Sequence, residues 1–194
     1  MSLSFKVSDK ELLAVRNKIF KEFGIPELEK NGFVKRPFKS SWFGEYYSGI
    51  QGYIYEFGRI SDNSCLEYID VYIVRGDRYI KVFLNIFKLS PEINSIEQLQ
   101  GCVGLNYGLP PNSLTEMQLR SDDYKGPPLF YMLFCPEHKL GRSCSKRGFD
   151  RKVSKLAELI KKDMANIDSF VKRWHELHQV NQTDWEGKVY SVKK

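Results

Sequence analysis

The sequence predicts an α+β fold: an antiparallel β-meander of about four to five strands, packed against an N-terminal helix and a long C-terminal helix. Three observations predict it. Two runs with alternating apolar residues flank Gly76-Asp77, a capped amphipathic segment stands near the start, and an apolar stripe at helical spacing stands near the end. The 194 residues fit a single α+β domain over 1–194.

The first element is a helix that begins after Ser8. Ser8 is a favoured N-cap residue, and Glu11 stands three positions later, where it completes a capping box. Apolar residues follow at helical spacing: Leu12, Leu13, Val15, Ile19, Phe20 and Phe23. We expect the helix to end at Gly24, a residue suited to the C′ position. Pro26 then starts a short helical turn that closes at Asn31-Gly32.

Residues 66–89 carry the clearest hairpin signal, because a two-residue loop that begins with Gly joins two period-2 runs. Placing Arg75 opposite Arg78 pairs Val74 with Tyr79 and all residues behind them in turn. One face is then aliphatic: Ile69, Val71, Ile73, Ile80, Val82, Leu84 and Ile86. The other, mixed face carries Tyr68, Asp70, Tyr72, Lys81, Phe83, Asn85 and Phe87. A slip of one residue would exchange the faces.

A strand over residues 52–60 precedes this hairpin, and an irregular, aromatic and basic edge strand over 33–48 precedes that. We expect Ile60 to face Cys65 across the polar turn between them. In that register, alternation adds two more rings to the mixed face of the hairpin, those of Tyr53 and Tyr55.

Beyond the hairpin, residues 95–100 predict a short helix, and a Gly/Pro-rich loop at 101–128 follows. The short aromatic run 129–135 favours a strand. A basic helical C-terminal region at 149–178 carries an apolar stripe that we expect to cover the aliphatic face: Val153, Leu156, Ile160, Met164, Ile167, Val171 and Trp174.

The charge and composition limit the partners and the cellular location that we expect for the protein. The net charge of +6 arises in residues 139–194, which carry 14 basic against 7 acidic residues. Such a segment attracts nucleic acid or acidic partners, or is simply a solvated helix face. No apolar run approaches the roughly 20 residues of a membrane span, and the N-terminus lacks an apolar signal region, so we expect a cytoplasmic protein without a membrane partner.

The cysteines and His138 allow two further interpretations. Cys102, Cys135, His138 and Cys144 are the residue types of a Cys₃His zinc site, although their spacing is not that of a standard finger. Cys135 and His138 also pair a nucleophile with a base, but no catalytic-cysteine signature surrounds them. We therefore expect neither a metal nor a cofactor, and we assign no catalytic residue.

The mixed face is the candidate binding surface. Buried charge must be paired, so Asp70 and Lys81 together predict a partly open pocket rather than a dry core, with the 101–128 loop as its rim. We expect Lys81 to pair with Asp70. The predicted ligand-binding residues are Tyr53, Tyr55, Tyr68, Asp70, Tyr72, Lys81 and Asn85.

The stretch Asn31-Gly-Phe-Val-Lys35 after an N-terminal helix, followed by an aromatic meander, resembles uncharacterised bacterial α+β domain families. Some proteins of this type accompany secreted toxins as cytoplasmic immunity proteins, which implies a protein partner. The leading expectation is a non-enzymatic bacterial protein that binds a protein or small ligand. The alternative is nucleic-acid association through the basic C-terminal region. A hydrolase, the third, needs a perturbed Cys, His or carboxylate in the same cleft.

Overall fold

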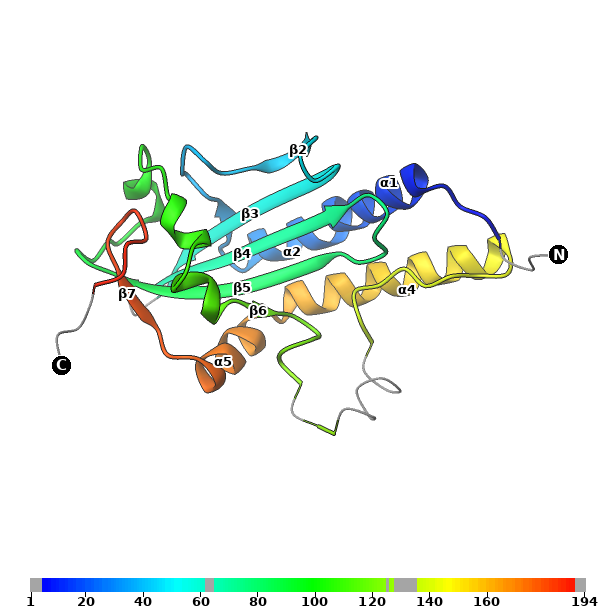
Figure 1. Cartoon of the computed structure of the whole chain (residues 1–194). Coiled ribbons are helices and arrows are strands. Elements are labelled where there is room, and N and C mark those ends of the chain that lie inside the picture. The colour runs from blue at the N-terminus through cyan, green and yellow to red at the C-terminus, as the bar shows by residue number, and fades with distance from the viewer. Residues whose placement is uncertain (1–4, 62–64, 125, 128–135, 191–194) are drawn as a thin grey trace.

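The computed structural model describes residues 5–61, 65–124, 126–127 and 136–190 (Figure 1). These residues confirm the α+β class, since helices pack against a seven-stranded sheet in which every pairing is antiparallel except that of β7 with β5. The order is β1-β3-β4-β5-β6, and β2 also pairs with β3. The strands are β1 (Val34–Lys35), β2 (Phe43–Tyr47), β3 (Gly52–Ile60), β4 (Cys65–Val74), β5 (Lys81–Leu89), β6 (Met117–Gln118) and β7 (Asn181–Thr183).

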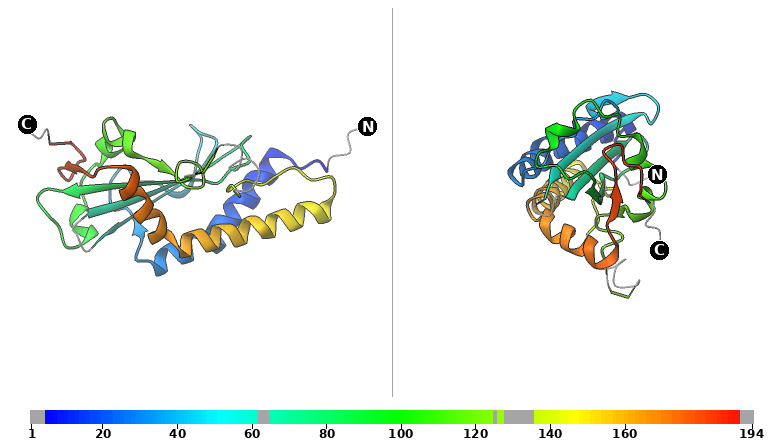
Figure 2. Two further views of the ribbon diagram at one scale, coloured as in Figure 1. Left: turned by 90° about the horizontal axis from the view of Figure 1, so that it is seen from below. Right: turned by 90° about the vertical axis from the view of Figure 1, so that its left-hand side faces the viewer.

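The helices cover one face of the sheet, and short 3₁₀ turns lie on the other (Figure 2). The first group comprises α1 (Asp9–Ile19), α2 (Ile25–Lys30), α4 (Lys146–Ala165) and α5 (Ile167–Leu177). The 3₁₀ turns are η2 (Ile96–Leu99), η3 (Leu105–Gly108) and η4 (Asn112–Thr115). The N-terminal half of α4 extends beyond the sheet at the end opposite to η3 and η4. Among the described residues, no helix combines the length and apolarity needed to cross a bilayer.

The predicted register of the central hairpin is confirmed from Tyr72, which faces Lys81, to Ile69, which faces Leu84. Its aliphatic face is buried, and the stripe on α4 and α5 packs against it as predicted. The two strands separate nearer the turn, where the buried side chain of Arg16 inserts from α1. Its guanidinium donates to the carbonyls of Tyr79 at 2.7 Å and Val74 at 2.9 Å. Val74 and Tyr79 therefore do not pair with each other as predicted, and both of their carbonyls accept hydrogen bonds from Arg16 instead.

The predicted register of β3 with β4 is wrong by one residue. Ile60 pairs with Leu66 rather than with Cys65, and the Ser61 N–H donates to the Cys65 carbonyl at 2.9 Å, which continues this register to the turn. Tyr53 and Tyr55 consequently face the helices. The Tyr55 ring is buried 5.0 Å from that of Phe20, measured between centroids. Glu56 takes the place expected for the tyrosines, directly opposite Asp70.

Gly24 does not end the first helical segment, as the sequence suggested. The chain stays helical through a π-turn over Phe20–Gly24, in which the Ile25 N–H donates to the Phe20 carbonyl, and it continues into α2. The reason for glycine here is close approach. A Cβ on Gly24 would lie 2.5 Å from the Phe20 ring.

The sheet is larger than the predicted four or five strands because β6 and β7 add two very short ones. Pairings of two or three residues carry no periodicity that a sequence can reveal. The run 129–135, predicted as a strand, lies outside the described residues.

The mixed face of the hairpin is divided between two environments. Near the end of β5, Tyr68 and Phe87 join a second apolar cluster beneath η2 and η3: Phe38, Leu66, Leu89, Ile93, Ile96, Leu99 and Tyr107. Farther along the same face, Asp70 and Tyr72 lie outside that cluster and line a cavity.

Candidate functional site

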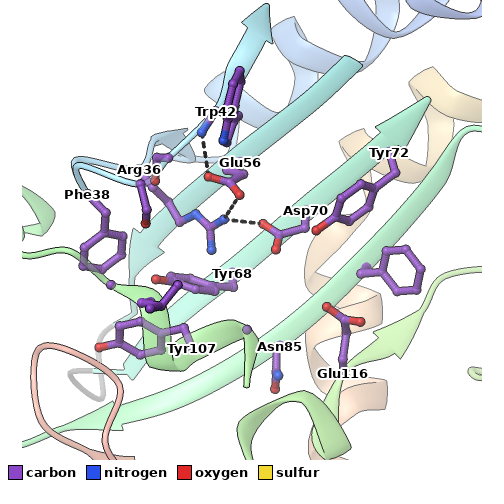
Figure 3. Close-up of a pocket in the computed structure, with 16 residues that line it drawn as sticks. Arg36, Phe38, Trp42, Glu56, Tyr68, Asp70, Tyr72, Asn85, Tyr107 and Glu116 are labelled. Atoms are coloured by element: carbon purple, nitrogen blue, oxygen red, sulfur yellow. Dashed lines mark hydrogen bonds and ion pairs between the residues drawn. The ribbon is translucent and has the colours of Figure 1, made fainter. Parts of the chain in front are cut away.

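A cavity of about 320 Å³ opens on the mixed face, between the central strands and the loop that carries η3 and η4 (Figure 3). The size is at the lower end of the range for small-ligand sites. Its walls are rich in rings: Phe38, Trp42, Tyr68, Tyr72, Phe83 and Tyr107. Its polar groups are concentrated in one arginine and three carboxylates.

Arg36 joins two of those carboxylates across adjacent strands (Figure 3). Its Nη2 lies 2.9 Å from Oε1 of Glu56 and 2.8 Å from Oδ1 of Asp70. The Trp42 backbone N–H donates to Oε2 of Glu56 at 2.8 Å. The guanidinium carbon also stands 4.0 Å from the centroid of the Tyr68 ring, in cation–π contact. Arg36 thus neutralises one charge at the floor of the cavity and is itself buried.

The cavity perturbs its carboxyl groups. Burial raises the pKa of Asp70 to about 6, with Arg36 opposing this shift and Glu56 adding to it. At the mouth, Glu116 is exposed at its outer side, and the partial loss of water around its carboxyl group, followed by the Asp70 charge, raises its pKa. Burial acts to lower the pKa of Arg36, yet Asp70, Tyr68 and Glu56 raise it above its usual value. The arginine therefore stays charged.

Two acceptors remain open toward the cavity. Oδ1 of Asp70 is buried and, although it lies close to Nη2 of Arg36, accepts no hydrogen bond. Oδ2 of Asp70 and the Glu116 carboxylate form no hydrogen bond or ion pair with the described residues. With Glu56, Asp70 and Glu116 ionised, three negative charges face the single positive charge of Arg36. The pocket is therefore acidic, and its open carboxylates can meet hydrogen-bond donors of a ligand.

Asn85 anchors the loop that forms the rim. Its Nδ2 donates to the Asn112 carbonyl at 2.8 Å, and its Oδ1 accepts from the Thr115 hydroxyl at 2.9 Å. Asn112, which is buried, in turn donates to the Gly187 carbonyl at 2.6 Å. The amide of Asn85 is therefore used within the protein, although the residue also lines the cavity.

The C-terminal segment and α5 hold the same loop from outside. The backbone N–H of Gly104 donates to the Glu186 carboxylate at 2.8 Å, and the Tyr107 hydroxyl donates to the Asp184 carbonyl at 3.1 Å. On α5, the Trp174 indole N–H donates to the Thr115 carbonyl at 2.7 Å. These bonds fix the rim against the sheet, so the cavity is a preformed feature of the fold.

Four of the seven residues predicted for binding line the cavity: Tyr68, Asp70, Tyr72 and Asn85. Tyr53 and Tyr55 lie on the opposite face of the sheet because of the β3–β4 register. Lys81 pairs with Asp77, at 3.0 Å between Nζ and Oδ2, rather than with Asp70. The predicted Asp70–Lys81 pair is therefore wrong, because an aspartate four residues earlier is in reach of the lysine.

The residues that the sequence interpretation missed are Arg36, Glu56 and Glu116. Arg36 comes from an irregular segment broken by Pro37, so no alternation assigns its face. Glu116 ends a loop without periodicity. The available signal was Asp70 itself, because a buried carboxylate needs a cation and that cation can come from outside the hairpin.

The candidate zinc ligands do not form a cluster in the part of the chain that the structure describes. Cys135 lies outside that part, and Cys144 is exposed. His138 is buried on the helix side, with its Nε2 2.7 Å from Oδ2 of Asp163. Asp163 also accepts two hydrogen bonds from Arg120. His138 thus belongs to a polar cluster beneath α4 and not to the cavity.

Comparison of the chain with protein-family models, with curated proteins and with solved structures finds no match. The resemblance to uncharacterised bacterial α+β domain families stays a prediction, and the site is interpreted from its own geometry.

Proposed function

We propose that the protein is a binding protein whose cavity takes an organic cation, such as a primary ammonium group. The open acceptors on Asp70 and Glu116 carry this proposal. They offer charge-assisted hydrogen bonds to an ammonium, and such bonds are about twice as strong as neutral ones.

The rings around the carboxylates support the same ligand class. Trp42, Tyr72 and Phe83 line the cavity, and aromatic faces attract a desolvated cation. An anion would be repelled by the carboxylates of the cavity, because Arg36 compensates only one of their three charges. A neutral apolar ligand would leave Asp70 and Glu116 without donors and would cost their desolvation.

Titration calorimetry with n-butylammonium, n-butanol and butyrate tests the proposal. We expect butylammonium alone to bind, with an affinity that falls about tenfold in Asp70→Asn and in Glu116→Gln, which is about 1.4 kcal/mol each. Affinity should rise from pH 5 to pH 8, because the cation binds the ionised carboxyl groups and both of their pKa values are raised, that of Asp70 to about 6.

Glu29→Gln provides the matched control, since it removes one exposed carboxylate on α2 without touching the cavity. It should leave butylammonium binding unchanged. Equal binding of butylammonium and butanol, or equal losses in the control and the cavity variants, would contradict the proposal.

A second function, association with nucleic acid, is favoured by one observation on α4. Four lysines, Lys139 before the helix and Lys152, Lys155 and Lys162 on it, line a shallow groove together with Glu137 and Glu158. Exposed Arg142, Lys146, Arg147 and Arg151 continue the basic surface toward the N-terminus of the helix. A phosphate backbone is the partner that such a surface attracts. The salt dependence of this binding separates it from cation binding.

A further inference from the structure

The loop that forms the rim of the cavity exposes several large apolar side chains to solvent. Among the described residues, the two most exposed large hydrophobic side chains are Leu114, at 73% exposure, and Leu105, at 62%. Leu109 and Val103 follow on the same loop, at 47% and 45%. Each of the four is a cavity-lining residue or stands within two positions of one. We call these four residues the collar.

The exposure of the collar is not a consequence of a loose loop. Buried Tyr107 and Asn112 stand between its members and hold the loop to the sheet and to the C-terminal segment by the hydrogen bonds described above. The leucines are therefore held outward by a fixed backbone. Exposed apolar groups that gather beside a polar site mark a contact surface.

We propose that the collar and the cavity together dock a protein segment in which a lysine or arginine side chain is flanked by apolar residues. The inference rests on the proposed function, because the basic side chain would occupy the cation site. Charge complementarity selects the occupant: the cavity holds three carboxylates against Arg36, and only a positive group relieves that excess.

The arrangement has the form of a protein-interface hot spot. A charged anchor would enter the pocket, and exposed apolar side chains on the rim loop would limit the access of water to the ion pair. A phospholipid headgroup fits less well, because it would bring a phosphate into a cavity with three carboxylates. Leu105 and Trp42 both line the cavity, so an inserted side chain would pass between apolar surfaces.

The test uses three acetylated and amidated heptapeptides with a labelled terminus: a central lysine flanked by leucines, the same lysine flanked by serines, and a central acetyl-lysine flanked by leucines. By fluorescence anisotropy, we expect the first peptide to bind the whole chain at least tenfold more tightly than either of the others. The double variant Leu109→Ser/Leu114→Ser should abolish the preference for leucine flanks and keep butylammonium binding, because neither residue lines the cavity.

The matched control is Leu177→Ser on α5, which removes another exposed leucine and should change nothing. Equal binding of the leucine- and serine-flanked peptides would overturn the docking inference, as would a preference that survives in the double variant. So would binding of the acetyl-lysine peptide as tight as the lysine peptide, or dimerisation of the protein that the double variant abolishes. Failure of the unsubstituted protein to bind butylammonium would instead contradict the proposed function.

Discussion

Arg36 determines how the buried carboxylates of the cavity are compensated. Two carboxylates on neighbouring strands, Glu56 and Asp70, face each other across the β3–β4 ladder, where like charges repel. The guanidinium between them turns that repulsion into a pair of short ion contacts and leaves one Asp70 oxygen for a ligand. Its stacking on Tyr68 fixes the plane in which those contacts form.

Replacing Arg36 with leucine should therefore destabilise the protein by about 3 kcal/mol at pH 8, because two buried carboxylates lose their counter-ion. The cost should shrink toward pH 5. Without Arg36, the pKa of Asp70, which burial already raises to about 6, rises further above its unfolded value, so the folded state binds more protons than the unfolded state and its stability falls as pH increases. Urea denaturation at several pH values measures this.

Arg75→Leu supplies the control for this prediction. Arg75 lies exposed in the turn after β4, and its loss removes the same charge without uncovering a buried carboxylate. A stability loss in Arg36→Leu that is independent of pH would indicate a packing effect instead of an uncompensated charge.

At the level of elements, the parts of the fold that the sequence could predict are those with strict alternation. The two-residue turn and the aliphatic residues of β4 and β5 determine one register, because any slip would bury polar groups among the helices. In β3, both faces carry large residues, such as Tyr55 and Ile54, so alternation alone did not decide between the two registers. The deciding interactions were distant: Phe20 against Tyr55 on one face, and Arg36 against Glu56 on the other.

The same distinction explains why the candidate site was predicted in part. Asp70, Tyr72 and Asn85 follow from the hairpin register and were assigned to the correct face. Arg36 and Glu116 come from an irregular strand and a loop, whose positions depend on tertiary hydrogen bonds. Local patterns carry no information about such contacts.

Asn85 links the sheet to the rim loop, and its replacement by leucine should loosen that loop. The Asn112 carbonyl and the Thr115 hydroxyl would each lose the hydrogen bond to Asn85 and keep the bond that joins them to each other, at a cost of about 1 kcal/mol in unfolding free energy. Hydrogen exchange should accelerate over residues 105–115 more than in the helices. Asn94→Leu, an exposed position, is the control. A uniform increase in exchange throughout the chain would argue against a local anchor.

On the scale of the whole molecule, opposite charges are separated in space. The acidic cavity lies near the 3₁₀ turns, whereas the basic end of α4 extends from the other end of the sheet (Figure 1). The net charge of +6 is therefore the sum of an acidic cavity and a basic surface on α4. Since the fields of the two surfaces are screened over about 8–10 Å at physiological salt, each surface can be tested while the other stays intact.

If the α4 surface binds nucleic acid, the affinity for a labelled single-stranded 20-mer should fall steeply with salt. Contact with about four phosphates predicts a slope of about −3 in log affinity against log salt concentration. Lys152→Glu/Lys155→Glu should flatten that slope, whereas Lys88→Glu/Lys188→Glu, with the same charge change at exposed positions outside the groove, should preserve it. Asp70→Asn should leave oligonucleotide binding unchanged. Binding that is insensitive to salt, or that both double variants weaken equally, would show that α4 provides no phosphate-binding surface and would leave the acidic cavity as the one proposed site.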